Sequence, residues 1–145
     1  MSSDWSSDVC SSDLVLSFTD KRVDAILSFY DGMSDGVIPV LRNQGISGEV
    51  ILTGQDADLY ACHHILDGEQ DMTIYKSLKN LAHTAAETAY SIATGKKPEG
   101  INSSVDNGRI EVPAILLDPQ VIDKENMREI LVRDGFYTEE QLFNR

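Results

Sequence analysis

Several residue types and patterns are scarce in this chain, and each scarcity excludes a class of protein. Two cysteines in 145 residues are too few for a disulfide framework. No apolar run approaches the roughly eighteen residues of a membrane-spanning helix. Basic residues number 12 against 24 acidic ones, which gives a net charge of −12. Because this charge repels a phosphate backbone, we expect no nucleic acid as a partner.

The sequence also lacks the motifs of common catalytic and metal sites. It contains no phosphate-binding loop and no His-Glu-x-x-His helix. The run Cys62-His63-His64 suits a metal poorly, because adjacent helix residues point about 100° apart and zinc ligands on one helix favour i and i+4. We therefore expect no catalytic residue, no metal and no cofactor.

The first fourteen residues differ from the rest of the chain. Ser-Ser-Asp occurs three times there, without a helical or strand period and without the pattern of a signal peptide. Residues 4–14 resemble the translation of a common sequencing adapter. We expect residues 1–14 to be an artefactual or disordered leader, in which case the absent targeting signal carries no information.

Beyond this leader, strand and helix patterns alternate in a chain whose overall composition, 41% apolar, is ordinary for a globular protein. Residues 23–29 predict a strand buried on both faces. Asp31 or Ser34 is placed to cap a following helix, which Gly45 ends. The inner face of this helix is expected to carry Val37, Ile38, Val40 and Leu41.

The same alternation continues twice. Residues 50–53 predict a second strand, and Asp56 or Asp58 opens a helix that Gly68 closes. Residues 72–75 predict a third strand before the longest helix, residues 78–94. That helix carries one apolar stripe at helical spacing, made of Leu78, Leu81, Ala82, Ala85, Ala86, Ala89, Ile92 and Ala93.

The C-terminal third is less regular. Residues 95–100 predict a loop and residues 106–108 a turn. Residues 109–117 predict an extended strand in which Pro113 marks a bend, a sheet edge or a change of sheet. Residues 123–132 predict a short helix before a polar tail. The fold class that these elements indicate is α/β, a parallel sheet with flanking helices.

Polar clusters occur at the ends of the three predicted strands: Tyr30-Asp31-Gly32, Gly54-Gln55-Asp56 and Tyr75-Lys76. In an open α/β sheet, ligands bind at the carboxyl ends of the strands. The clusters therefore predict a ligand cleft. Two simpler roles stay open: Asp56 before a helix is often an N-cap, and Asp31 before a glycine is common turn chemistry.

The order and spacing of several motifs resemble the type I periplasmic sugar-binding proteins of ABC importers. The likeness covers nearly everything after Leu14 and is greatest to the multiple-monosaccharide and xylose-binding branch. The residues that carry it are Val23-Asp24-Ala25-Ile26-Leu27, Tyr30-Asp31-Gly32-Met33-Ser34, Thr53-Gly54-Gln55-Asp56-Ala57, Thr73-Ile74-Tyr75-Lys76, Val112-Pro113-Ala114-Ile115-Leu116-Leu117 and Asp134-Gly135-Phe136-Tyr137 with Glu140-Gln141-Leu142.

The resemblance implies the C-terminal part of a two-lobed fold. By it, residues 15–76 are part of the C-terminal sugar-binding lobe. Residues 77–112 are a crossing segment and a helix expected to pack on a missing N-terminal lobe. Residues 113–145 hold a return strand, a short helix and the C-terminal tail.

The resemblance also implies sugar contacts at Asp56, Lys76, Asp31, Tyr30 and Gln55. A pyranose offers hydroxyl groups that both donate and accept, and an apolar face of C–H bonds. Asp56 suits the acceptor role and Lys76 the donor role. At the position of Tyr30, related xylose binders have an asparagine. In place of the asparagine amide, Tyr30 is expected either to stack on the C–H face of the sugar or to donate its hydroxyl.

The implied function is the substrate-binding component of an ABC-type import system for a monosaccharide such as xylose, glucose or galactose. The implied partners of the parent protein are the sugar and an ABC permease, with a chemoreceptor as a further candidate. The implied location is periplasmic, or extracytoplasmic as a lipoprotein. The alternative is the effector-binding domain of a LacI-type repressor, which shares the two-lobed fold and would carry a helix-turn-helix upstream.

Overall fold

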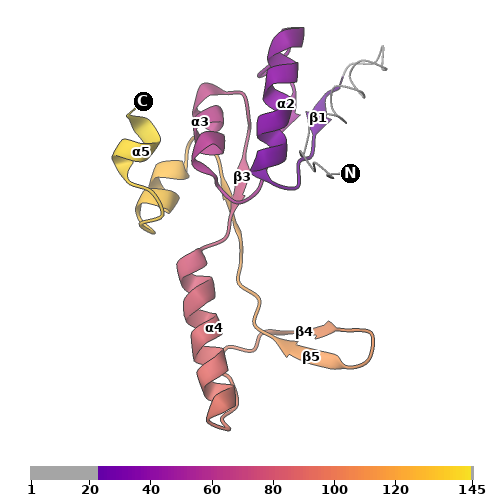
Figure 1. The fold of residues 1–145 in the computed structure, drawn as a ribbon, viewed down its shortest axis with the longest axis vertical. Coiled ribbons are helices and arrows are strands. Elements are labelled where there is room, and N and C mark those ends of the chain that lie inside the picture. Colours follow the sequence, from indigo (N-terminus) through magenta and orange to yellow (C-terminus); the bar gives the residue numbers. More distant parts are fainter. Residues whose placement is uncertain (1–22, 145) are drawn as a thin grey trace, which may run out of the picture. The chain divides into compact units, whose positions relative to one another are not determined.

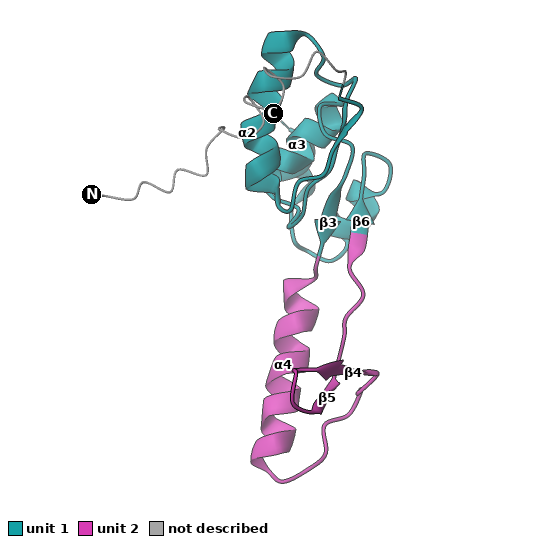
Figure 2. Cartoon of the chain, turned by 90° about the vertical axis from the view of Figure 1, so that its right-hand side faces the viewer, with its two compact units in different colours: residues 1–75, 121–145 teal, residues 76–120 magenta. Residues whose placement is uncertain are grey.

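The computed structural model describes residues 23–144, so the expected leader, residues 1–14, lies outside the described part. The chain divides into two compact units, Lys76–Gln120 and the segments on either side of it (Figure 2). Within residues 23–144, no helix has the length and apolar character needed to cross a membrane.

The first unit is built on short strands, and the pairing among the first three follows the sequence pattern. Strand β1, Ala25–Ile26, runs parallel to β2, Ile51–Leu52, with Ala25 opposite Ile51. A parallel bridge between Thr53 and Met72 continues the pairing toward β3, Thr73–Tyr75. Strand β3 in turn pairs with β6, Gln120–Ile122. The parallel part of the α/β prediction is therefore confirmed.

Helix α2, Asp31–Gln44, has the inner face that its periodicity predicts. Val37, Ile38, Val40 and Leu41 are all buried, and Gly45 ends the helix with a positive φ of 72°. The predicted cap is wrong, since Tyr30 occupies the N-cap position and no side chain caps the helix. Asp31 and Ser34 lie inside the helix, and their side chains bond to other segments.

Helix α3, Leu59–Asp67, packs beside α2 (Figure 1). Gly68 follows it with a φ of 77°, as predicted. Asp58 occupies its N-cap position, although the carboxylate does not bond to the helix amides. A core cluster joins the inner face of α2 to β2; its buried members are Val37, Ile38, Leu41, Val50 and Leu52.

A second core cluster links α3 and β3 to the C-terminal elements. The predicted helix at 123–132 is a turn followed by a π-helix, η1, Arg128–Val132, and the tail forms α5, Glu139–Phe143. Thr138 and Gln141 form a capping box at the start of α5. The buried members of the cluster are Ala57, Cys62, Ile65, Tyr75, Ile122, Met127, Leu131 and Leu142.

One face of the β1–β2 pair departs from the prediction of a strand buried on both faces. Leu27 is 77% exposed and Ile51 is 55% exposed, whereas the alternating neighbour Leu52 is fully buried. Strand residues alternate between faces, and the packed helix α2 covers the face that holds Leu52. The prediction concerns residues 23–29, in which Ser28 alone is buried, and it is therefore wrong.

The second unit contains helix α4, Leu78–Ala93, and a hairpin (Figure 1). Ser77 caps α4 by accepting a hydrogen bond from the Asn80 amide. Strand β4, Ser103–Asp106, pairs antiparallel with β5, Glu111–Ala114, around the predicted turn. β5 contains Pro113 and is an edge strand of this two-stranded sheet, as proline in a strand indicates. None of residues 76–120 is buried.

Candidate functional site

The centre of the candidate site is the segment Gly54-Gln55-Asp56-Ala57-Asp58, here called the 54–58 loop. It connects the end of the second predicted strand to the N-terminal end of α3. Asp56 is exposed, and its φ of 102° lies in the left-handed region that favours glycine. Ala57 follows with a φ of 56°. Such conformations persist only where the surroundings hold them, and they cluster at functional sites.

Hydrogen bonds hold the loop backbone along its whole length. The Asp56 amide donates to the Ile74 carbonyl at 2.8 Å, and the Ile74 amide donates to the Gly54 carbonyl at 3.2 Å. The Ala57 amide donates to Oγ1 of Thr73, and the Ala57 carbonyl accepts from the Tyr137 hydroxyl. The loop is thus fixed by β3 on one side and by the C-terminal segment on another.

Asp31 completes this anchoring from the first turn of α2. Its amide donates to the Gln55 carbonyl at 2.9 Å, and its carboxylate accepts from the Asp58 amide at 2.9 Å. Its side chain is fully buried, and burial raises its pKa against the lowering effect of these hydrogen bonds. This enclosure is at odds with a direct contact between Asp31 and a sugar, and it points to a different role.

Tyr30 lies at the end of the first predicted strand, at the N-cap position of α2. Its side chain is 39% exposed and folds back over Gly32. A Cβ atom added at Gly32 would lie 2.6 Å from Cε2 of the Tyr30 ring, so glycine is required for this ring position. The ring has an accessible surface, which stacking on a sugar requires.

Gln55 and Lys76 occupy the positions that the sequence predicts for them. Gln55 is half-buried, and its backbone carbonyl accepts the Asp31 amide. Lys76 directly follows β3, is exposed and is the first residue of the second unit. In the first unit, the strand ends that carry Tyr30, Gln55 and Asp56 therefore lie close together.

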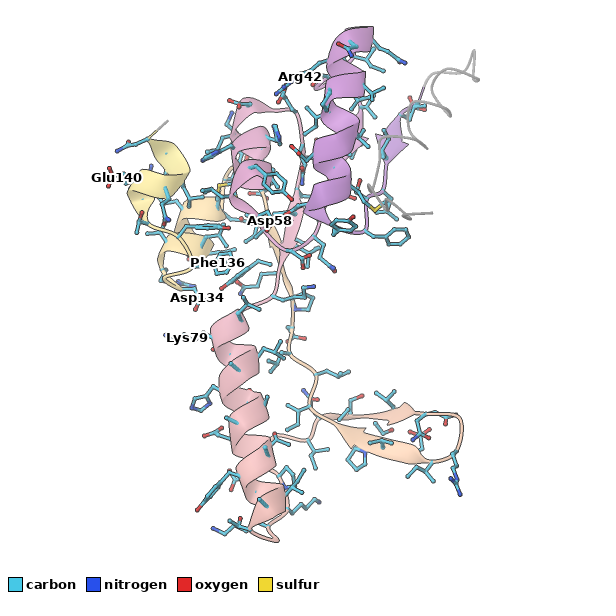
Figure 3. All side chains as sticks on the ribbon, viewed as in Figure 1. Arg42, Asp58, Lys79, Asp134, Phe136 and Glu140 are labelled. Carbon is cyan, nitrogen blue, oxygen red and sulfur yellow. The ribbon has the colours of Figure 1, made fainter. Side chains whose placement is uncertain are left out.

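Neighbouring polar groups shape the electrostatics of the loop. Asp58 lies at the N-terminal end of α3 (Figure 3), where its Oδ2 accepts a 2.7 Å hydrogen bond from the Tyr60 hydroxyl. Burial and this carboxylate raise the pKa of Tyr60, so the phenol stays protonated. Of the carboxylates near the loop, that of Asp56 is exposed, so the site favours ligands that donate hydrogen bonds.

Cys62, His63 and His64 diverge, as the helical geometry predicts. The thiol of Cys62 is buried and donates toward the Ala57 carbonyl, and burial raises its pKa to about 12. His63 bonds to the Gln141 carbonyl, whereas His64 lies between Asp35 and Glu69. Among residues 23–144, no group of three or more histidine, cysteine and acidic residues is arranged to hold a metal ion.

Three residues of the site escape the sequence analysis: Gln70, Thr73 and Tyr137. Thr73 and Gln70 both donate to the Asp31 carboxylate, and Tyr137 bonds to the loop. A threonine within an apolar strand carries no distinctive signal. The Asp-Gly-Phe-Tyr motif marks the position of Tyr137 in sequence, but its link to a loop eighty positions earlier depends on the fold.

Comparisons with known proteins agree with this architecture. The chain is 43% identical over 123 residues to a D-xylose-binding periplasmic protein of Haemophilus influenzae, and the match covers 85% of this chain and 37% of that protein. A carbohydrate transporter solute-binding protein of Chloroflexus aurantiacus, solved with D-glucose, superposes with a TM-score of 0.83 at 27% identity over 92% of this chain.

An ABC transporter solute-binding protein of Clostridium phytofermentans, solved with β-D-glucose, gives a TM-score of 0.77 at 31% identity over 90% of this chain. The chain spans about two fifths of each solved structure, 40% and 42% respectively. The periplasmic binding protein domain family matches residues 2–97. The chain therefore has the type I fold of the sugar-binding proteins and belongs to the periplasmic binding protein domain family.

Proposed function

We propose that the parent protein binds a monosaccharide outside the cytoplasmic membrane and delivers it to an ABC permease, and that this chain holds one lobe's share of the sugar site. The observation that carries the proposal is Asp56, an exposed carboxylate held in a left-handed backbone conformation at a strand exit. The similar proteins are named as sugar-binding or transport components and not as enzymes, which supports binding over catalysis.

The chemistry of the loop suits a sugar hydroxyl. Asp56 offers two carboxylate oxygens, each able to accept a hydroxyl hydrogen. Hydrogen bonds to a charged group contribute roughly 1.5–3 kcal/mol each. Tyr30 supplies an accessible ring for the C–H face of the sugar, and Gln55 supplies an amide. Lys76 is proposed as a further donor, to be tested by its own variant, Lys76→Met.

The class of sugar follows from the names of the similar proteins. One is a xylose-binding protein and two were solved with glucose, so we propose a pyranose monosaccharide. A periplasmic or lipid-anchored extracytoplasmic location is proposed on the same ground. The transporter names support an ABC permease as the proposed partner, and a chemoreceptor partner is a further proposal.

A two-lobed protein is needed to test binding, because this chain spans 37% of the length of the Haemophilus protein. The test replaces the matching stretch of that protein with residues 23–144 of this chain. Calorimetry with xylose, glucose, galactose and arabinose should detect binding of at least one sugar. Heat changes indistinguishable from dilution across the whole panel would refute the proposal.

Two variants of this hybrid protein locate the site. Asp56→Ala should abolish measurable binding, because it removes the carboxylate. Asp118→Ala removes an exposed carboxylate of the second unit and should leave the affinity unchanged. The unaltered 145-residue chain should show little or no affinity for the same sugars. Equal affinities for Asp56→Ala and the parent hybrid would refute the role of Asp56.

A further inference from the structure

The carboxylate of Asp31 is enclosed at the point where three chain segments meet. Its side chain is fully buried, and its two oxygens accept hydrogen bonds from donors on separate segments. These donors are the Asp58 amide at 2.9 Å, the Thr73 hydroxyl at 2.9 Å and the Gln70 side-chain amide at 3.1 Å. A buried carboxylate that is satisfied in this way fixes the positions of its donors.

Asp31 joins the 54–58 loop, which contains the strained residues Asp56 and Ala57, to β3, which holds that loop in place. Asp31 holds the carbonyl of Gln55 on one side of Asp56 and the amide of Asp58 on the other. It also holds the Thr73 hydroxyl, whose oxygen accepts the Ala57 amide at 3.2 Å. The two residues with unfavourable φ values, Asp56 and Ala57, therefore lie between bonds that lead back to one buried carboxylate.

The loop backbone lies close against the Asp31 side chain at Gly54. A Cβ atom added at Gly54 would overlap Oδ1 of Asp31 and would lie 2.5 Å from Nε2 of Gln70. The loop backbone thus approaches the carboxylate as closely as a residue without a side chain allows. This approach explains why glycine stands at the start of the loop.

From these contacts we propose that Asp31 is a positioning residue of the sugar site, one that holds Asp56 and Ala57 in the left-handed conformation without touching the ligand. The proposal rests on the proposed function, since Asp56 is its sugar contact. It assigns to Asp31 a role through the backbone in place of the direct contact that the sequence suggests.

The substitution Asp31→Asn distinguishes the two roles. The new side chain would keep one oxygen for the Asp58 amide and the Thr73 hydroxyl, which both lie 2.9 Å from Oδ2 of Asp31, and would lose only the bond from Gln70. If Asp31 positions the loop, Asp31→Asn should therefore keep most of the sugar affinity and Asp31→Ala should lose it. If Asp31 contacts the sugar through its charge, both variants should lose affinity.

The first experiment measures amide hydrogen exchange by NMR in the full 145-residue chain. Asp31→Ala should speed exchange at Asp56, Ala57 and Asp58 at least tenfold more than at the core amides of α2. The matched control is Ser34→Ala, which removes a part-buried 2.7 Å hydrogen bond to the Thr53 carbonyl from the same helix turn. The control should not single out the loop. A uniform change at all amides in Asp31→Ala would overturn the proposal.

A second variant decides the matter if Asp31→Ala does not fold. Thr73→Val keeps the side-chain volume but removes the hydroxyl between Asp31 and the Ala57 amide. It should raise exchange at Ala57 at least tenfold more than at the α2 core amides. Unchanged exchange at Ala57 would contradict the proposed link.

The binding readout uses the two-lobed hybrid protein. Asp31→Ala should weaken sugar binding at least tenfold, and Asp31→Asn should weaken it less than threefold. Equal losses in both variants would restore the direct contact, and unchanged affinity in both would remove any role. If Asp56→Ala leaves binding intact, the proposed function fails, while the exchange measurements still test the positioning of the loop.

Discussion

Both units of the chain contain regular helices and strands, but they differ in how many of their side chains are buried. The first unit contains two clusters of fully or almost fully buried side chains. The second has a capped sixteen-residue helix and a four-residue hairpin ladder, yet none of its residues is buried. Hydrogen bonding and capping define a helix, but most helical stability in proteins comes from packing an apolar face. A well-formed helix is therefore no measure of how stable its unit is.

The difference extends to backbone strain. The two non-glycine residues with positive φ among residues 23–144 are Asp56 and Ala57, and both lie in the first unit. Strained conformations persist where the surrounding structure over-determines them. The first unit supplies that support through Asp31, Thr73 and Tyr137. A candidate site therefore lies where the core can hold it.

The largest expected contrast is in amide hydrogen exchange. Core amides of α2 and α3 should open only with the whole unit, whereas those of α4 should exchange almost as fast as in a peptide. The ratio of protection factors should be about a thousandfold or more, because local opening free energies range from zero to the global value. NMR exchange on the 145-residue chain measures this ratio. Comparable protection in α4 would show that its apolar stripe is covered.

Truncation of matched leucines gives the next contrast. Leu41→Ala in α2 removes a fully buried side chain and should lower the free energy of unfolding by about 2–5 kcal/mol. Leu81→Ala in α4 removes one that is 52% exposed and should change it by about 0.5 kcal/mol or less. Urea unfolding followed by circular dichroism measures both. Equal costs would contradict the difference in packing between the two units.

Relief of strain at Asp56 should have a smaller effect of opposite sign. Asp56→Gly removes a steric cost of about 1–3 kcal/mol, partly offset by the greater freedom of glycine when unfolded. The free energy of unfolding should rise by about 1 kcal/mol. Asp118→Gly, at an exposed position without a positive φ, should lower it slightly or leave it unchanged. A loss of stability in Asp56→Gly would argue against strain at this position.

The smallest expected effect concerns an ion pair on the first unit, near the C-terminal end of α2 where Arg42 lies (Figure 3). Arg42 donates two hydrogen bonds to Glu69, at 2.6 and 2.5 Å, and lowers the pKa of that carboxyl to about 2. Because the folded pKa lies below the unfolded value of about 4.5, the stabilisation is present above that value and is lost as the pH falls toward 2.

Acid titration of the urea midpoint tests this pair. Glu69→Gln should remove its share of the pH dependence between about pH 5 and 2, and Arg42→Met should remove the larger part of that share, since His64 also bonds to Glu69. Both variants should differ less from the parent at about pH 2 than at about pH 6. A pH profile identical to that of the parent in both variants would contradict the role of the pair.

The sequence predicts the elements whose signals are local. Helices α2 and α3 follow from their periodicity and from Gly45 and Gly68, and the longest helix is off by one residue at its end. The capping box of Thr138 and Gln141 is also a local signal and would have revealed α5. Strands β4 and β6 escape prediction, because their signals depend on pairing with other segments.

The candidate site shows the same difference between residues with local sequence signals and residues whose roles depend on distant segments. Asp56 is recognisable as a polar residue at a strand exit, and its exposure agrees with that prediction. The buried role of Asp31 is not recognisable, because its side-chain partners lie 27 to 42 positions away in sequence. An aspartate before a glycine reads the same whether it faces solvent or is enclosed. Only the folded structure, in which α2, the 54–58 loop and β3 lie together around Asp31, distinguishes the two cases.

We propose that the 54–58 loop is held under strain to present Asp56 to a sugar. The most direct test of this claim is calorimetry on the two-lobed hybrid with Asp56→Gly, paired with urea unfolding of the same variant. We predict that the variant is at least as stable as the parent hybrid and yet binds none of the sugars that the parent hybrid binds. Undiminished affinity for such a sugar in this variant would contradict the claim.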